Sequence, residues 1–218
     1  MVDTATHSVE FDHEEFHREE IADRWMVLGV AALTLFAAWL RSSGLSRGSF
    51  YRDDAWVALT HRVPLSEAWK MVGTAPGFTM FERFWVGLTA PSTWWAQLPV
   101  FLIAVLAVPL MVVVCRWWGL SRWASLFAAS LIACSHIAVI YATHLKPYSH
   151  DIVAGVLVLA AAEFWRRGNT AWLFAVLAAI SFAVSFTIFP LILGCSVVMV
   201  VQGASSKRTL ALAAPLAR

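Results

Sequence analysis

No charged residue occurs in the segment 168–206, and this stretch constrains the fold more than any other part of the sequence. As one straight helix it would extend about 58 Å, because an α-helix rises about 1.5 Å per residue. That length is close to two bilayer thicknesses, since the hydrocarbon core is about 30 Å across. The segment therefore has to turn back on itself. We place the turn near 187–190, between helices at 171–186 and 190–203.

Further apolar runs recur along the chain and indicate a multi-pass membrane protein. Hydrophobic residues make up 60% of the 218 residues and charged residues 14%, whereas a soluble domain carries about 25% charged residues. This composition excludes a water-soluble globule, a disordered chain and a nucleic-acid-binding module. We expect an all-α helical bundle in the cell membrane with about six transmembrane helices. They are predicted at 25–40, 94–118, 123–141, 152–165, 171–186 and 190–203.

The charges outside these runs predict how the chain is oriented in the membrane. Residues 1–24 carry a net charge of −6, so the remaining residues carry +8. Basic residues in short loops favour the cytoplasmic side, and those that flank the predicted spans share one side if the N-terminus is cytoplasmic. We therefore expect an acidic cytoplasmic tail at 1–24, a transmembrane domain at 25–203 with a long outer loop at 41–93, and a cytoplasmic tail at 204–218.

The sequence pattern of the outer loop is too regular for a flexible linker. Asp53 or Asp54 can cap a helix, because a carboxylate accepts hydrogen bonds from the free N–H groups of a helix start. Pro64 ends that helix, and apolar residues recur at helical spacing later in the loop. Several tryptophans suit the bilayer interface. We expect amphipathic helices on the membrane surface, at 55–62, 67–72 and 78–88.

Two polar clusters on the outward side carry candidate chemistry, and the first is the adjacent pair Asp53 and Asp54. Two neighbouring carboxylates repel each other, so one pKa tends to rise unless a cation lies close by. Such a pair can supply a general base together with a metal or orienting ligand. The alternative is a helix cap with a solvated neighbour, since capping aspartates are common.

The second cluster is the segment 141–151, which joins the third and fourth predicted spans. Lys146 can neutralise a lipid phosphate as a compact positive charge, or its long side chain can simply extend to the membrane surface. Asp151 can cap the helix that follows. His144 and His150 have no specific metal-binding spacing, and we favour hydrogen bonding at the interface for both.

Four segments follow one another in a distinctive order along residues 25–203. They are Arg52-Asp53-Asp54-Ala55, the proline-containing stretch 74–83, the segments 94–99 and 118–122 around the second span, and Lys146-Pro147-Tyr148-Ser149-His150-Asp151. In this order and spacing the chain resembles the GT-C superfamily of membrane glycosyltransferases, notably the protein O-mannosyltransferase and aminoarabinose-transferase-like branch. Members of that family transfer a sugar from a polyprenyl-phosphate donor to an acceptor hydroxyl on the outer membrane face.

The resemblance implies a role for individual residues. Asp53 would be the general base on the acceptor hydroxyl, and Asp54 would orient the acceptor or, with Asp151, help to hold a divalent metal ion. Lys146 and Arg52 would bind the phosphate of the lipid donor. The residues that would support this site are Tyr148, His150 and Asp151.

The resemblance also implies a missing part. Members of the family usually have eleven or more spans, so we expect this chain to be an N-terminal half. It would act in the lipid bilayer with a C-terminal half or a membrane partner, and it would be inactive alone. The alternative is a non-catalytic membrane scaffold or assembly subunit whose outer loop binds partners. A small transporter is disfavoured, because the charges cluster at the interface rather than at the bilayer midplane.

Overall fold

The computed structural model describes residues 5–45, 52–71, 75–88, 92–168 and 171–213. Side chains are described between 21 and 202, apart from those of Ala22, Arg52, Trp69 and Met71. The described residues form α-helices and short 3₁₀ helices, with no β-strand among them. The predicted all-α class is therefore confirmed.

Ten α-helices and three 3₁₀ helices make up the described chain. They are α1 (Ala5–Ser42), α2 (Arg52–Leu59), η1 (Thr60–Arg62), α3 (Leu65–Met71), α4 (Pro76–Gly87), α5 (Thr93–Trp117), α6 (Arg122–Cys134), α7 (His136–Ile140), η2 (Tyr141–Thr143), α8 (Tyr148–Gly168), α9 (Ala171–Val184), η3 (Phe186–Ile188) and α10 (Phe189–Ala213).

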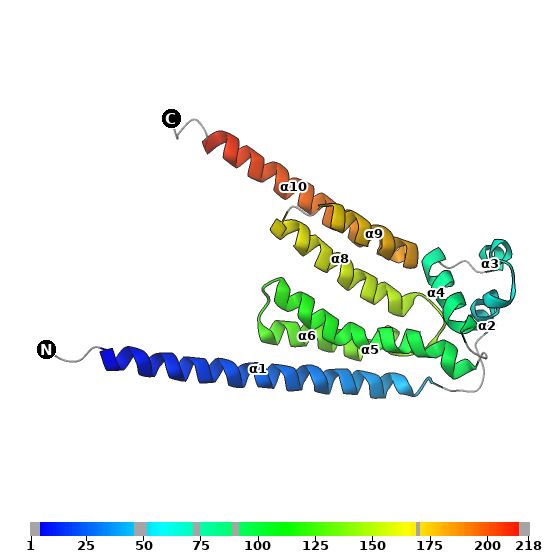
Figure 1. The fold of residues 1–218 in the computed structure, drawn as a ribbon, viewed down its shortest axis with the longest axis horizontal. Helices are drawn as coiled ribbons and strands as arrows, with labels where there is room; N and C mark the ends of the chain where they lie inside the picture. Colours follow the sequence, from blue (N-terminus) through cyan, green and yellow to red (C-terminus); the bar gives the residue numbers. More distant parts are fainter. Residues whose placement is uncertain (1–4, 46–51, 72–74, 89–91, 169–170, 214–218) are drawn as a thin grey trace.

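The long helices lie side by side in a bundle (Figure 1). Helix α5 packs against α1, α6 and α8, and α8 packs against α9 and α10. Helices α2, α3 and α4, here called the end helices, gather at one end of this bundle, where α1 ends and α8 begins. The chain reverses direction between α9 and α10 at η3, close to the turn predicted at 187–190.

Within the described part of the chain, two helices are long and apolar enough to cross a membrane, at Asp23–Ser42 and Thr93–Trp117. A third candidate is Arg122–Cys134 together with His136–Thr143, which are bent by 54° at their junction. The chain is therefore a membrane protein by length and composition of these helices, and the apolar helices indicate contact with a lipid bilayer. Its orientation in the membrane stays a prediction.

The predicted count of six spans is wrong for the described residues. Helix α9 has 14 residues and is about 21 Å long, which is short of the roughly 30 Å of hydrocarbon. The helical segment Phe186–Gln202 is likewise a shorter apolar helix. Helix α8 carries Asp151 in its first turn, Glu163 further on and Arg166 in its last turn, so its uninterrupted apolar stretch is too short to cross alone.

The predicted third span at 123–141 is broken at Ser135, and a buried arginine stabilises the break. Arg41 of α1 donates hydrogen bonds to the backbone carbonyls of Ile132 and Ala133 at the end of α6, at 2.9 and 3.0 Å. The Ser135 hydroxyl accepts from the Ala138 N–H and so caps α7. Helix ends leave backbone groups unpaired, and these contacts satisfy some of them inside the bundle.

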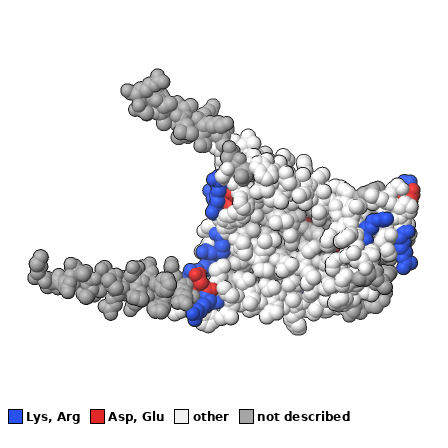
Figure 2. All heavy atoms as spheres, in the orientation of Figure 1, with Lys and Arg blue, Asp and Glu red and all other residues white. Residues whose placement is uncertain are grey.

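Charged side chains gather at the two ends of the bundle, and the face drawn in Figure 2 carries almost none between them. At the end far from the end helices, Asp23 pairs with Arg122, and Glu163 pairs with Arg166 and Arg167 as their helical spacing predicts. Ion pairs at the other end join Glu67 to Lys70 and Asp53 to Lys146. An uncharged belt between two charged ends suits a bilayer.

The outer loop was predicted to form two or three amphipathic helices, and the structure has three helices there, the end helices. Pro76 stands in the first turn of α4, where its missing N–H is no loss. Helix α4 buries Phe78 and Val86 and exposes Met80 and Phe84, which gives it one apolar face against the bundle and another toward the surroundings. Val72, the predicted end of the second helix, lies outside the described residues.

Candidate functional site

One buried leucine fixes the position of the connection between α7 and α8. Leu145 is fully buried, and it belongs to an apolar cluster with Val57 of α2, Phe78 of α4 and Val100 of α5. Its side chain holds the connection against the end helices. The neighbours of Leu145 in sequence, His144 and Lys146, are thereby brought to the start of α2.

Both predicted polar clusters meet at this point. Lys146 Nζ lies 3.2 Å from Asp53 Oδ2, and His144 Nδ1 lies 3.1 Å from Asp54 Oδ2. Each aspartate of the pair therefore faces a cationic or titratable partner from the α7–α8 connection. The structure brings together the acidic pair and the lysine that the sequence singled out, and it adds His144 as the partner of Asp54.

The two aspartates differ strongly in exposure. The Asp53 side chain is 70% exposed and its Lys146 partner 25%, whereas the Asp54 side chain is 1% exposed. Burial raises the pKa of the Asp54 carboxyl, and the charges of His144 and Lys146 with the backbone N–H of Leu145 partly offset that effect. The sequence predicted a raised pKa through repulsion between the two aspartates, but the main cause is burial of one of them.

Aromatic rings border the ion pairs. The Tyr141 ring lies edge-on to His144 with centroids 5.5 Å apart, and it contacts the ring of Tyr148 at 4.3 Å. Tyr148 is exposed, so its ring offers an apolar face beside Lys146. Tyr148 was predicted as a supporting residue, whereas Tyr141 was not singled out.

The other predicted supporting residues point toward the interior. His150 is buried with its ring edge-on to Phe78 and Phe81 of α4, at centroid distances of 5.0 and 5.6 Å. Burial lowers its pKa to about 4, and neither ring nitrogen has a hydrogen-bond partner among the described residues. Asp151 has one buried oxygen without a partner there. Arg52 begins α2, but its side chain lies outside the described residues.

Glu82 is a buried acid that sequence reasoning missed. It lies on the inward face of α4, fully buried, and neither of its carboxylate oxygens has a hydrogen-bond partner among the described residues. Burial raises its pKa to about 8. The signal was available, because Glu82 stands four positions after Phe78 and four before Val86, and helical spacing places the three side chains on one face.

The described residues around Asp54 and Asp151 do not fit a bound metal ion. Among the described residues, no three His, Cys, Asp or Glu side chains lie close enough together to hold one. Asp54, the first predicted metal ligand, faces His144 and lies near the positive charge of Lys146. These partners disfavour a metal cation at the same carboxylate. We therefore derive no catalytic step through a metal at Asp54 and Asp151.

Comparisons of the chain with protein-family models, with curated proteins and with solved structures find no match.

Proposed function

We propose that this chain carries the reaction site of a glycosyltransferase that moves a sugar from a polyprenyl-phosphate donor to an acceptor hydroxyl at the membrane surface. The observation that carries the proposal is the contact between Asp53 and Lys146, 3.2 Å apart. It places a carboxylate and an ammonium at one end of a bundle whose face in Figure 2 carries almost no charged residues between its two ends. The sequence resemblance to the GT-C superfamily supports the same reading.

These two side chains match the two charges that develop during glycosyl transfer. The acceptor oxygen gives its proton to the Asp53 carboxylate and forms a bond to the anomeric carbon of the sugar. The bond from that carbon to the phosphate oxygen breaks, and the polyprenyl phosphate leaves with the electron pair beside Lys146. A positioned base and a fixed cation both lower the barrier of such a step.

The exposure of the pair also suits this chemistry. An exposed ion pair contributes about 0–1 kcal/mol to stability, so folding gains little from Asp53 and Lys146. When the donor phosphate approaches Lys146, it competes with Asp53 for the ammonium and leaves the carboxylate able to accept a proton. Tyr148 supplies an apolar ring face beside the entering sugar.

Asp54 acts in this proposal as a positioning residue. Its buried carboxylate meets His144 at 3.1 Å, while the exposed carboxylate of Asp53 is the next residue along α2. The buried contact fixes the first turn of α2 against the α7–α8 connection. Asp53 and Lys146 are thereby held within reach of each other rather than left on independent loops.

The test uses native membranes of the cells that make this chain, so that a C-terminal half or membrane partner is present, together with polyprenyl-phosphate mannose or polyprenyl-phosphate arabinose that carries a labelled sugar. We expect label to leave the lipid fraction faster than in membranes of the same cells without the chain. Asp53→Asn should slow this transfer about 10²–10⁴-fold, the usual contribution of a general base. Glu67→Gln is the matched control, because it neutralises the carboxylate of another exposed ion pair in the end helices, Glu67–Lys70.

Two results would contradict the proposal. Full transfer by Asp53→Asn would remove Asp53 from the mechanism, and equal transfer in membranes with and without the chain would favour a membrane scaffold. The observation that favours a scaffold is the set of exposed apolar residues on the end helices, Trp56, Met80 and Phe84. In that case Trp56→Ala and Phe84→Ala should impair the function of the protein in cells, whereas Asp53→Asn should leave that function unchanged.

A further inference from the structure

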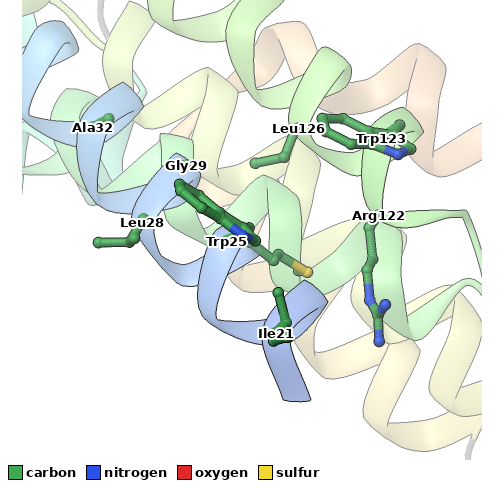
Figure 3. A pocket seen from close by; sticks show the side chains of 9 residues that line it. Ile21, Trp25, Leu28, Gly29, Ala32, Arg122, Trp123 and Leu126 are labelled. Atoms are coloured by element: carbon green, nitrogen blue, oxygen red, sulfur yellow. The ribbon is translucent and has the colours of Figure 1, made fainter. Parts of the chain in front are cut away.

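A groove of about 700 Å³ lies between α1 and α6, at the end of the bundle far from Asp53 and Lys146. Figure 3 shows its walls, with Ile21, Trp25, Gly29 and Ala32 on α1 facing Trp123 and Leu126 on α6. Its volume lies within the range of about 300–1,000 Å³ that is usual for small-molecule sites. We infer that this groove binds one anionic phospholipid, with an acyl chain along the groove and the phosphate at Arg122.

The length of the groove matches one leaflet of a bilayer. Its wall on α1 runs from Ile21 to Ala32, a rise of about 16 Å along the helix axis. Half of the hydrocarbon thickness is about 15 Å. An acyl chain entering at the Arg122 end therefore reaches the middle of the membrane when it reaches Ala32. Because both walls belong to candidate membrane-spanning segments, the groove opens toward lipid and not toward water.

Small residues on α1 create the space. A Cβ added at Gly29 would lie 3.4 Å from both terminal carbons of Leu126, so any larger side chain there would extend into the groove. The rings of Trp25 and Trp123 form part of the walls, and these side chains are 67% and 80% exposed. Tryptophan rings favour the headgroup level of a membrane, which is where the phosphate of a lipid in this groove would lie.

The end of the groove that holds Arg122 carries the complementary charge. Arg122 is the charged residue in the groove lining, and its Nη2 lies 2.9 Å from Asp23 Oδ1. The Asp23 side chain is 67% exposed, so this ion pair is weak. A guanidinium presents five N–H donors in a fork suited to phosphate, and it can bind a phosphate while Asp23 keeps it at the groove mouth.

The charge test uses the purified full chain, equilibrated with vesicles of equal parts phosphatidylglycerol and phosphatidylcholine and then examined by native mass spectrometry. We expect a one-to-one adduct that favours phosphatidylglycerol about fivefold, the effect of one basic residue at a membrane surface. Arg122→Gln should abolish the preference. Arg116→Gln is the matched control, because Arg116 is an exposed arginine at the same end that does not line the groove.

The groove itself is tested by filling it. Gly29→Leu should remove the lipid adduct, whereas Gly194→Leu should retain it, because a Cβ added at Gly194 meets nothing within 4 Å. Ala32→Leu fills the groove from a second position, so the test stands if Gly29→Leu does not fold. Equal binding of both lipids by the wild type, or lipid retained by folded Gly29→Leu and Ala32→Leu, would overturn the inference.

Discussion

The Asp53 carboxylate and the Lys146 ammonium lie 3.2 Å apart, from Oδ2 to Nζ, although 93 positions separate the two residues in sequence. Neither side chain is placed there by local structure. Asp53 stands in the first turn of α2, and Lys146 lies in the connection to α8. Packing of Leu145 between the end helices and α5 is what joins them.

Removing the lysine charge tests its role toward the leaving phosphate. Lys146→Ala should lower kcat/KM for a polyprenyl-phosphate sugar about 10²–10³-fold, the usual effect of deleting one group that stabilises developing negative charge. Lys146→Arg should restore part of the activity, because it keeps the charge. Initial rates of label release from the lipid measure both, with Lys70→Ala as the control. Unchanged rates for Lys146→Ala would show that Lys146 is a surface residue without a role in the transfer.

Leu145 is predicted to link stability and activity. Leu145→Ala should lower the free energy of unfolding by about 2–5 kcal/mol, because truncation of a buried leucine leaves a cavity. It should also lower transfer, because Lys146 loses its anchor. Thermal unfolding in detergent and the transfer assay measure the two effects. Leu65→Ala, at an exposed leucine of α3, should change neither; a fully stable Leu145→Ala would contradict this account.

The buried Glu82 should make stability fall as the pH rises. Its pKa is about 8 in the folded chain and near 4.5 when unfolded, so unfolding between these values releases a proton, and higher pH favours the unfolded state. Above pH 6.5 the buried His150 is neutral when folded and mostly neutral when unfolded, so most of the pH dependence that it causes lies below the window from pH 6.5 to 8. The difference between the wild type and Glu82→Gln in that window therefore reports on Glu82.

The measurement is the unfolding midpoint of the wild type and of Glu82→Gln across that window. The wild-type midpoint should fall between pH 6.5 and 8, whereas that of Glu82→Gln should fall much less, because the amide does not titrate. Parallel curves for the two proteins would show that Glu82 is solvated or paired when folded.

Gly44 is required by a close approach of two chain segments. A Cβ added at Gly44 would lie 2.1 Å from Oγ1 of Thr143 in η2, so Gly44→Ala should cost about 1–3 kcal/mol through overpacking. Thr143→Ala removes the clashing oxygen and should recover most of that stability in the double variant. Gly168→Ala is the control, since a Cβ there meets nothing within 4 Å. A double variant no more stable than Gly44→Ala alone would place the strain elsewhere.

The sequence by itself determined the features that depend on nearby residues. Proline positions and apolar spacing predicted the end helices, because helix starts, breaks and faces are set within a few residues. The pairing of Glu163 with Arg166 and Arg167 followed from their spacing on one helix. The reversal between α9 and α10 followed from the length of the uncharged stretch.

Only the tertiary structure decided the contacts that join distant segments. The sequence overcounted the spans, because apolar runs do not reveal how long each helix becomes, and α9 with its 14 residues is too short to cross. It also did not show the break at Ser135, where Arg41 binds the freed carbonyls. It did not separate the exposed Asp53 from the buried Asp54, nor did it pair Asp54 with His144. Burial and long-range pairing depend on how the whole chain packs. No local sequence pattern predicts the packing of Leu145 between the end helices and α5.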